Sequence, residues 1–170
     1  MSGKVEPNLE DGIRIANRFL ERATPITDMK SYEIAGSIRR HRPTVHDVDV
    51  VFRPLTRREI VARELKDLCN QMPDVQIVKW GAKLSSIVYC GVPFDFYFST
   101  PETFATLLLI RTGSKENNIR LCSIAKSRGW KLHASGEGLF NEKGERVAGD
   151  SEDSIYKALG LPYQEAWERE

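Results

Sequence analysis

Two features of specialised proteins are missing from this 170-residue chain. The chain has no large excess of positive or negative charge, because 25 Lys and Arg residues nearly balance 24 Asp and Glu residues and leave a net charge of +1. A dedicated nucleic-acid-binding domain is usually more basic, so any contact with nucleic acid must rest on a local patch. Cysteine is scarce, since Cys69, Cys90 and Cys122 lie far apart without a CxxC pair. This spacing argues against a zinc site and fits reduced thiols in a cytosolic setting.

Long apolar runs, repeats and low-complexity tracts are missing as well. The first ten residues, MSGKVEPNLE, lack the apolar segment of a secretion signal. The apolar run at 107–110 is far shorter than the roughly 20 residues that a membrane-spanning helix needs. We therefore expect a monomeric, cytoplasmic protein without membrane contact, built as one domain or as two small lobes.

Apolar periodicity predicts a mixture of helices and strands. Helices are expected where apolar residues recur every three or four positions, namely from an Asn8 cap to about Arg22, at 56–72, from a Thr100 cap through Leu109, and at 114–128 and 151–159. Strands are expected in β-branched and aromatic runs, at 31–35, 45–52, 75–80, 84–89, 92–99, 130–133 and 138–140. Cys90–Gly91 reads as a tight turn joining two antiparallel strands.

Residues 36–51, GSIRRHRPTVHDVDVV, form the most informative stretch. Gly36 and Ser37 follow a predicted strand and precede a short predicted helix, at 38–42, that Pro43 ends. Such a turn presents free backbone N–H groups to an anion, and glycine lets a phosphate approach the backbone closely. The pattern therefore predicts a phosphate-binding turn.

Three aspartates accompany this turn. Asp47 and Asp49 are two positions apart on a predicted strand, so their side chains share one face. Asp95 lies within the aromatic sequence FDFYF and faces away from Phe94 and Phe96. If the two strands are neighbours, three carboxylates converge and predict a site for two divalent metal ions. The alternatives are a solvated strand face for the pair and an isolated edge carboxylate for Asp95.

The order of these motifs resembles the family X DNA polymerases, which belong to the nucleotidyltransferase superfamily. The resemblance rests on GSIRR, HDVDVV, the later aspartate, RTGSKENNIRL at 111–121, and the tail GLF…GERVAG…SIYKALGLPY at 138–163. It implies an α+β fold: a nucleotidyltransferase palm with a mixed β-sheet flanked by helices, plus a small α/β thumb lobe. The implied divisions are a residual fingers helix and linker at 1–30, the palm at 31–99 and the thumb at 100–170.

The resemblance also implies roles for individual residues. Asp47, Asp49 and Asp95 match the catalytic residues that bind two Mg²⁺ ions, for which Mn²⁺ can substitute. The remaining matches concern the nucleotide: Gly36, Ser37 and Arg40 at the phosphates, Gly113 at the sugar, and Asn118 with Asn117 at the base edge. We add His46, Ile110 and Arg111 as nucleotide-site candidates. His46 and His133 are expected to pack or hydrogen-bond locally instead of binding metal.

Three departures from the family pattern affect the expected properties. Ile110 and Arg111 replace the usual Tyr-Phe pair, which affects discrimination between deoxyribose and ribose. Pro93 replaces an arginine two residues before the third aspartate, so Asp95 must be oriented by another group. The resemblance does not extend to the amino-terminal lyase domain or most of the fingers, as in minimal viral polymerases, so tight gap binding and processivity are expected to be affected.

The implied activity is template-directed addition of a dNTP to a DNA primer 3′-hydroxyl, with short-gap filling in DNA repair as the expected role. The expected partners are dNTP and primer-template or gapped DNA. Arg39, Arg42, Lys126, Arg128 and Lys131 are candidate DNA-backbone contacts or, equally, solvated surface charges. The alternatives are nucleotidyl transfer to a small molecule or a protein, and a non-catalytic module that binds nucleotide or DNA.

Overall fold

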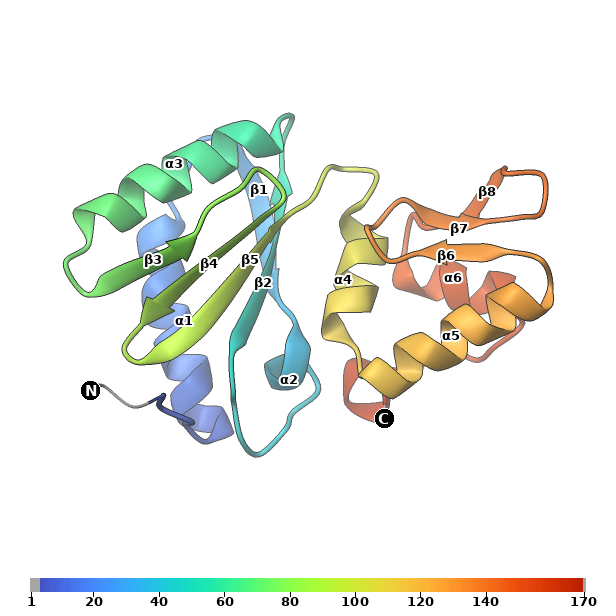
Figure 1. Cartoon of the computed structure of the whole chain (residues 1–170), viewed down its shortest axis with the longest axis horizontal. Helices are drawn as coiled ribbons and strands as arrows, with labels where there is room; N and C mark the ends of the chain where they lie inside the picture. Colours follow the sequence, from blue (N-terminus) through green and yellow to red (C-terminus); the bar gives the residue numbers. More distant parts are fainter. Residues whose placement is uncertain (1–3, 170) are drawn as a thin grey trace.

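The computed structural model describes residues 4–169 as two lobes lying side by side (Figure 1). The larger lobe contains a five-stranded sheet and the smaller lobe a three-stranded sheet. Six α-helices over the described residues complete a mixed fold, which confirms the predicted α+β class. The ends of the expected 1–30 and 100–170 divisions, at 1–3 and 170, lie outside the described residues. No helix among the described residues is both long enough and apolar enough to cross a membrane.

The larger lobe is built from α1–α3 and β1–β5. Their bounds are α1 Leu9–Ala23, β1 Met29–Ile34, α2 Gly36–Arg39, β2 Val48–Pro54, α3 Arg58–Gln71, β3 Val75–Lys79, β4 Leu84–Tyr89 and β5 Val92–Phe98. The strand order is β1-β2-β5-β4-β3. Only the central pair, β2 and β5, is parallel, while the other neighbours are antiparallel. The sheet is therefore mixed, as expected.

The smaller lobe follows α4 and contains two further helices beside three short strands. Their bounds are α4 Phe104–Thr112, α5 Lys115–Ser127, β6 Lys131–His133, β7 Gly138–Phe140, β8 Arg146–Ala148, α6 Glu152–Ala158 and the 3₁₀ helix η1 Ala166–Glu168. The strands β6 and β7 were predicted, and the strand β8 was not.

Helix caps decide several boundaries. The side chains of Asn8, Ser114 and Ser151 each accept a hydrogen bond from the backbone N–H three residues later. These bonds confirm the predicted cap at Asn8 and fix the starts of α5 and α6. The prediction that Thr100 caps the next helix is wrong, because α4 begins at Phe104 after Thr103. The Thr100 side chain instead accepts from the Thr103 backbone N–H at 3.3 Å, and this holds 100–103 as a separate turn.

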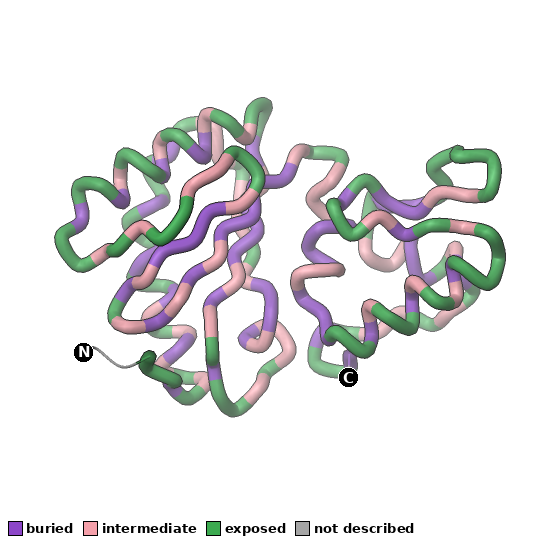
Figure 2. The backbone as a smooth tube through the Cα atoms, viewed as in Figure 1, coloured by how far each residue is buried: buried purple, intermediate pink, exposed green. Residues whose placement is uncertain are grey.

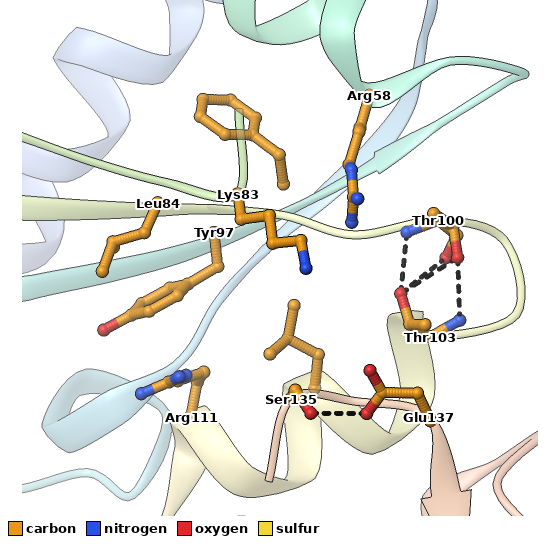
Figure 3. A pocket seen from close by; sticks show the side chains of 11 residues that line it. Arg58, Lys83, Leu84, Tyr97, Thr100, Thr103, Arg111, Ser135 and Glu137 are labelled. Atoms are coloured by element: carbon orange, nitrogen blue, oxygen red, sulfur yellow. Dashed lines mark hydrogen bonds between the residues drawn. The ribbon is translucent and has the colours of Figure 1, made fainter. Parts of the chain in front are cut away.

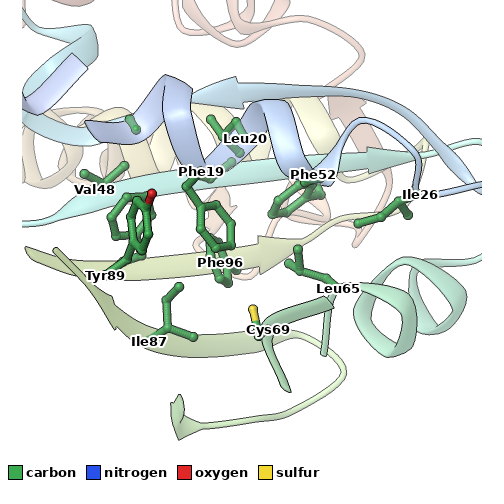
Figure 4. Packing of buried hydrophobic residues seen from close by; sticks show 14 of the residues in the cluster. Phe19, Leu20, Ile26, Val48, Phe52, Leu65, Cys69, Ile87, Tyr89 and Phe96 are labelled. Carbon is green, nitrogen blue, oxygen red and sulfur yellow. The ribbon is translucent and has the colours of Figure 1, made fainter. Parts of the chain in front are cut away.

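One face of the five-stranded sheet carries the main core. Alternate residues of β2 and β5, including Phe52, Phe94 and Phe96, point at α1 and α3 and are fully buried. Phe19 of α1 lies at the centre, with its ring centroid 5.3 Å from that of Phe96 and 5.4 Å from that of Phe94 (Figure 4). Helix α1, which the sequence predicts to be a residual part of the fingers, thus packs into the same core as the sheet.

The opposite sheet face is covered differently. Val51 and Tyr97 pack against Leu107 and Leu108 of α4 and form a second apolar cluster with Ala35. Buried residues run through the sheet centre and recur in α4, with the exposed Pro101 and Glu102 between them (Figure 2). The polar residues of β2 and β5 on this face therefore lie between the sheet and the smaller lobe.

Candidate nucleotide and metal site

Two of the three aspartates lie directly opposite each other. The parallel register of β2 and β5 pairs Asp49 with Asp95, on the face turned away from the phenylalanine core. Asp47 lies just before β2. The expected adjacency of the two strands is thus confirmed, and their parallel register brings Asp49 and Asp95 side by side.

Two hydroxyl groups orient these carboxylates. The Tyr97 hydroxyl donates to Asp49 Oδ1 at 3.3 Å, and the Ser86 hydroxyl donates to Asp95 Oδ1. Ser86 of β4 is the register partner of Asp95, on the side of β5 away from Asp49. Ser86 thus supplies an orienting contact where Pro93 replaces the family's arginine. Sequence reasoning missed it, because only the strand register places Ser86 beside Asp95.

The half-buried Asp49 has a strongly perturbed carboxyl group. Burial, the charge of Asp47 and the charge of Asp95 together raise the pKa of Asp49 to about 7. The Tyr97 hydrogen bond and the charge of Arg111 act in the opposite direction. A carboxylate so placed is stabilised by a nearby cation.

The Gly36 turn lies directly against Asp49. Gly36 has a φ of +58°, and a Cβ added there would lie 2.1 Å from Asp49 Oδ2. Ser37, the next residue, has a buried hydroxyl with no hydrogen-bond partner among the described residues. Buried hydroxyl groups are usually paired, so Ser37 Oγ has capacity for one further hydrogen bond.

Arg40 joins this turn to the smaller lobe. Its guanidinium donates to the carbonyl oxygen of Thr112, at the end of α4. The same Nη1 atom would lie 3.2 Å from a Cβ added at Gly113, where φ is +73°. Arg40 Nε is buried and has no hydrogen-bond partner among the described residues. Arg40 is thus held in place while part of its guanidinium stays unpaired.

A cavity of about 460 Å³ unites these groups. It is lined by both lobes: Gly36, Ser37, Arg40, His46, Asp47, Asp49, Ile110, Arg111, Gly113, Lys115, Asn118 and Ile119. Its volume lies in the range of about 300–1,000 Å³ typical of small-molecule sites. Lys115 and Ile119 were not predicted to lie at this site, although both are within one helical turn of Asn118 on α5. Asp95 lies outside this lining, next to Asp49 in the sheet.

The two asparagines of α5 have different environments. Asn118 donates its amide to the carbonyl of Ile110 at 2.8 Å, and its Oδ1 is buried without a partner among the described residues. Asn117 is only 1% exposed and donates to the Tyr156 hydroxyl at 3.1 Å. The structure therefore places Asn117 in the interior of the smaller lobe, and not at the cavity as predicted.

Arg111 and His46 both line the cavity, as predicted. The guanidinium of Arg111 lies 4.4 Å above the ring of Tyr97, a cation–π arrangement, and its Nε is buried and unpaired among the described residues. His46 Nδ1 lies 3.0 Å from Glu6 Oε1, with both side chains largely exposed. Arg111 therefore forms part of the wall next to Asp49, and His46 part of the rim.

Two of the candidate DNA contacts have internal partners instead. Arg39 donates to both carboxylate oxygens of Glu152, at 2.8 and 2.7 Å, and so joins α2 to α6. Arg128 donates to the carbonyls of Ala158 and Leu159, at the end of α6. Arg39 is therefore half-buried in an ion pair within the protein, whereas Arg128 contacts the end of α6 and stays exposed, and contact with DNA stays a prediction for both.

The other three candidates remain at or near the surface. Lys126 and Lys131 are exposed, and Arg42 is half-buried. They lie on different elements, with Lys126 on α5, Lys131 on β6 and Arg42 after α2. A role in contacting DNA stays a prediction for these residues.

The donor set fits a divalent cation by its chemistry. Asp47, Asp49 and Asp95 offer only carboxylate oxygens, which Mg²⁺ prefers, and the charges of Asp47 and Asp95 raise the pKa of Asp49. Within residues 4–169, no three carboxylate, imidazole or thiol groups are clustered as a ready-made metal site.

Comparisons with known proteins agree with this geometry. Residues 107–170 match the family model described as DNA polymerase beta thumb. The DNA polymerase/3′-5′ exonuclease PolX of Bacillus subtilis (strain 168) is 32% identical over 154 residues, which cover 88% of this chain and 26% of that protein. The chain thus spans about a quarter of the length of this curated relative.

A solved structure has the same fold. Polymerase beta of Leishmania infantum, in a ternary P/T complex, superimposes with a TM-score of 0.83 at 20% identity. The match covers 99% of this chain and 78% of that one. At this identity, the similarity establishes the arrangement of both lobes and not the chemistry.

Proposed function

Because this chain is a family X DNA polymerase-like protein, we propose that it adds a nucleotide from a dNTP to the 3′-hydroxyl of a DNA primer on a template. Filling of short gaps in DNA repair is the proposed role. The observation that carries the proposal is the cavity in which the Gly36–Ser37 turn, Arg40 and Asp49 meet, with Asp95 opposite Asp49 in the sheet. The palm is proposed to be 31–99 and the thumb 100–170.

Each side chain has a distinct task in this reaction. Asp47, Asp49 and Asp95 would hold Mg²⁺. When bound, these ions supply charge stabilisation for the attacking and leaving oxygens of an in-line displacement. Asp95 accepts the Ser86 hydroxyl on Oδ1 and would accept the proton of the attacking 3′-hydroxyl on Oδ2.

The phosphates of the nucleotide would lie against the opposite wall. The unpaired hydroxyl of Ser37 would donate to a phosphate oxygen, and the unpaired Nε of Arg40 would neutralise the charge that develops on pyrophosphate. Gly36 lets this wall approach Asp49. The nucleotide would then bridge the two lobes, because Gly113, Asn118 and Ile119 close the cavity from the smaller lobe.

Primer extension tests the proposal. With Mg²⁺ and dNTPs on primed and gapped DNA, the protein should add nucleotides and Asp95→Asn should lower the rate by about a thousandfold or more, as expected for loss of a group that acts on the reacting atoms. Asn keeps the acceptor for Ser86, so the fold should be retained and should be checked by circular dichroism.

The matched control is Asp67→Asn, an exposed aspartate on α3. Near-normal rates for Asp95→Asn would overturn the assignment of Asp95. Absence of extension on every DNA substrate would favour transfer to a small molecule or a protein. Nucleotide binding without any turnover would favour a non-catalytic module.

A further inference from the structure

Residues 163–169 of the smaller lobe reach across to the end of α2 in the larger lobe. The ring of Trp167 in this segment stacks on the ring of His41, with centroids 5.3 Å apart and planes inclined by only 9°. Trp167 is 53% exposed, and His41 is exposed as well. The pair is therefore a surface contact between the lobes, outside the apolar clusters of either one.

The backbone of His41 has a conformation that side chains disfavour. Its φ is +57°, in the left-handed region where glycine is favoured and a residue with a Cβ is strained. Strain of this kind persists only where the surrounding structure holds the residue in place. The backbone N–H of His41 donates to the Ile38 carbonyl at 2.9 Å, and its ring is held by Trp167. A position that favours glycine thus carries a ring that contacts the other lobe.

The backbone on either side of His41 is bonded to the turn that contains Ser37. The N–H of Arg40 donates to the Gly36 carbonyl at 3.2 Å. The N–H of Arg42 donates to the Ser37 carbonyl at 3.0 Å. A movement of His41 therefore shifts Ser37 and Arg40, the two residues whose unpaired groups are proposed to hold the nucleotide phosphates.

Both sequence neighbours of Arg40 are attached to the smaller lobe. On one side, Arg39 donates to both carboxylate oxygens of Glu152. On the other side, His41 stacks on Trp167. The guanidinium of Arg40 itself donates to a backbone carbonyl at the end of α4. These contacts together fix the direction in which the Arg40 side chain leaves the backbone.

Elsewhere the lobes are separated by a cavity of about 300 Å³, between Lys83 of the β3–β4 loop and the segment before β7 (Figure 3). Two pairs of its lining residues hydrogen-bond to each other, namely Thr100 with Thr103 and Ser135 with Glu137 (Figure 3). Each pair lies within a few residues of the chain, so these bonds hold local turns and do not join the lobes. The contacts at the end of α2 are therefore important for the position of the smaller lobe.

We propose that Trp167 is a positioning residue of the nucleotide site, which acts through His41 to hold Ser37 and Arg40 where a triphosphate binds. This inference rests on the proposed function and adds to it a residue that does not touch the nucleotide. Among the described residues, those that line the nucleotide cavity include neither Trp167 nor His41. The stacked pair therefore affects the affinity for the nucleotide and leaves the chemical step at Asp95 unchanged.

Substitution of His41 separates this role from a contribution to the fold. In His41→Gly the relief of the strained φ offsets the loss of the ring contact, so the urea midpoint should be nearly unchanged. The KM for dNTP in primer extension should rise about three- to tenfold, the range expected for loss of one aromatic contact, with kcat unchanged. A fall in kcat without a rise in KM would overturn the proposal.

Substitution of Trp167 tests the other half of the contact. Trp167→Ala should raise KM by a similar factor, and Trp167→Phe should restore it because the ring is kept. Because both changes remove the same contact, the double variant of His41→Gly and Trp167→Ala should show no greater effect than either change alone. Additive effects would contradict the proposed route through His41.

The matched control is His133→Ala, which removes a histidine ring from another aromatic pair of the smaller lobe, that with Phe140. Its KM should equal that of wild type. An equal rise in KM for this variant and for Trp167→Ala would overturn the proposal, because it would show a general effect of weakening the smaller lobe.

Calorimetric titration with tripolyphosphate, without primer or nucleotide, distinguishes failure of this inference from failure of the proposed function. Wild-type protein should bind tripolyphosphate, and Trp167→Ala should bind it more weakly by about the factor seen in KM. If this holds while no DNA is extended, the polymerase function fails and the positioning role stands. If DNA is extended but KM and tripolyphosphate binding are the same in both proteins, the positioning role fails and the function stands. If wild-type protein neither binds tripolyphosphate nor extends DNA, both proposals fall.

Discussion

The missing side chain of Gly36 allows the backbone to lie beside a carboxylate. Any Cβ at this position would overlap Asp49 Oδ2, and the backbone has a positive φ that side chains disfavour. The two effects can be separated, because Gly144 has a φ of +75° with no atom within 4 Å of an added Cβ.

Gly36→Ala should therefore abolish most nucleotidyl transfer and weaken dNTP binding, because Asp49 and the turn cannot both keep their positions. The substitution should also destabilise the fold by more than the roughly 1 kcal/mol expected from a strained φ alone. Extension rates and urea unfolding are the measurements. Gly144→Ala should lose only the stability expected from the strained φ and should keep its activity. An equal loss of activity in both variants would contradict the steric explanation.

The raised pKa of Asp49 predicts how stability depends on pH in the absence of divalent metal. The folded group, with a pKa of about 7, binds a proton more tightly than the unfolded group, whose ordinary pKa is 3.8. Stability contributed by this proton is present below about pH 4 and is lost as the pH rises to about 7. In EDTA, Asp49→Asn should therefore be more stable than wild type at pH 8, with a difference that shrinks toward pH 4.

Denaturant midpoints from pH 4 to pH 8 measure this effect. Because each pKa unit corresponds to about 1.4 kcal/mol, the difference at pH 8 should reach a few kcal/mol. Asp67→Asn removes an exposed carboxylate of α3 and should follow wild type at every pH. A constant offset between Asp49→Asn and wild type would show that Asp49 does not titrate in this range.

The short helix α2 connects the Gly36–Ser37 turn to the smaller lobe. Its last residue, Arg39, forms a two-pronged ion pair with Glu152 of α6, and the fully buried Arg169 donates to Glu152 at 2.9 Å. Burial opposes ionisation of Glu152, but the hydrogen bond from Arg39 and the charges of both arginines outweigh it and lower the pKa of Glu152. One carboxylate thus serves two arginines.

Glu152→Gln should be strongly destabilising because it leaves two guanidinium groups without their countercharge. Removal of one partner from a buried ion pair typically costs about 3–5 kcal/mol. Urea unfolding at pH 7 measures this loss. Asp153→Asn is the matched control, since Asp153 of the same helix pairs with the exposed Lys157, and such pairs are worth about 0.3–0.5 kcal/mol. Equal effects of the two substitutions would contradict a structural role for the α2–α6 contact.

The two lobes share an apolar cluster and several polar contacts. Leu107 and Leu108 of α4 pack on the larger sheet, and Trp167 of η1 stacks on His41 with ring centroids 5.3 Å apart. Contacts of this extent favour unfolding of both lobes as one cooperative unit. The position of the smaller lobe is thus coupled to the stability of the larger one.

Tryptophan fluorescence can follow each lobe separately. Trp80 lies in the larger lobe and Trp130 in the smaller one. A variant in which Trp80 is the single tryptophan therefore reports on the larger lobe, and one with Trp130 alone reports on the smaller lobe. Their urea transitions should coincide. In a Glu152→Gln background the Trp130 transition should come at lower urea, because the contact between α2 and α6 is weakened. Separate transitions without this substitution would show that the lobes unfold independently.

The strands of the larger lobe and the faces of their side chains could largely be predicted from the local sequence pattern. Alternation placed Phe94 and Phe96 on the core face and Asp95 on the other, and the strand register confirms this. The prediction that a helix starts at Thr100 was wrong because the side chains of Thr100 and Thr103 hydrogen-bond to each other. This bond holds a separate turn, which competes with helix capping. Arg39 and Asn117 were misplaced for a different reason, since their partners Glu152 and Tyr156 are distant in the chain.

Short-range chemistry thus specifies the turn, the Asp47–Asp49 spacing and the caps at Asn8, Ser114 and Ser151, because each depends on neighbours within a few residues. Folding alone decides which groups orient Asp95 and which arginines have partners inside the protein. Ser86 reaches Asp95 through strand pairing, and Arg39 reaches Glu152 only because the smaller lobe packs beside α2. Contacts between segments far apart in the chain produce no periodic pattern in the sequence, so they can be identified only from the folded structure.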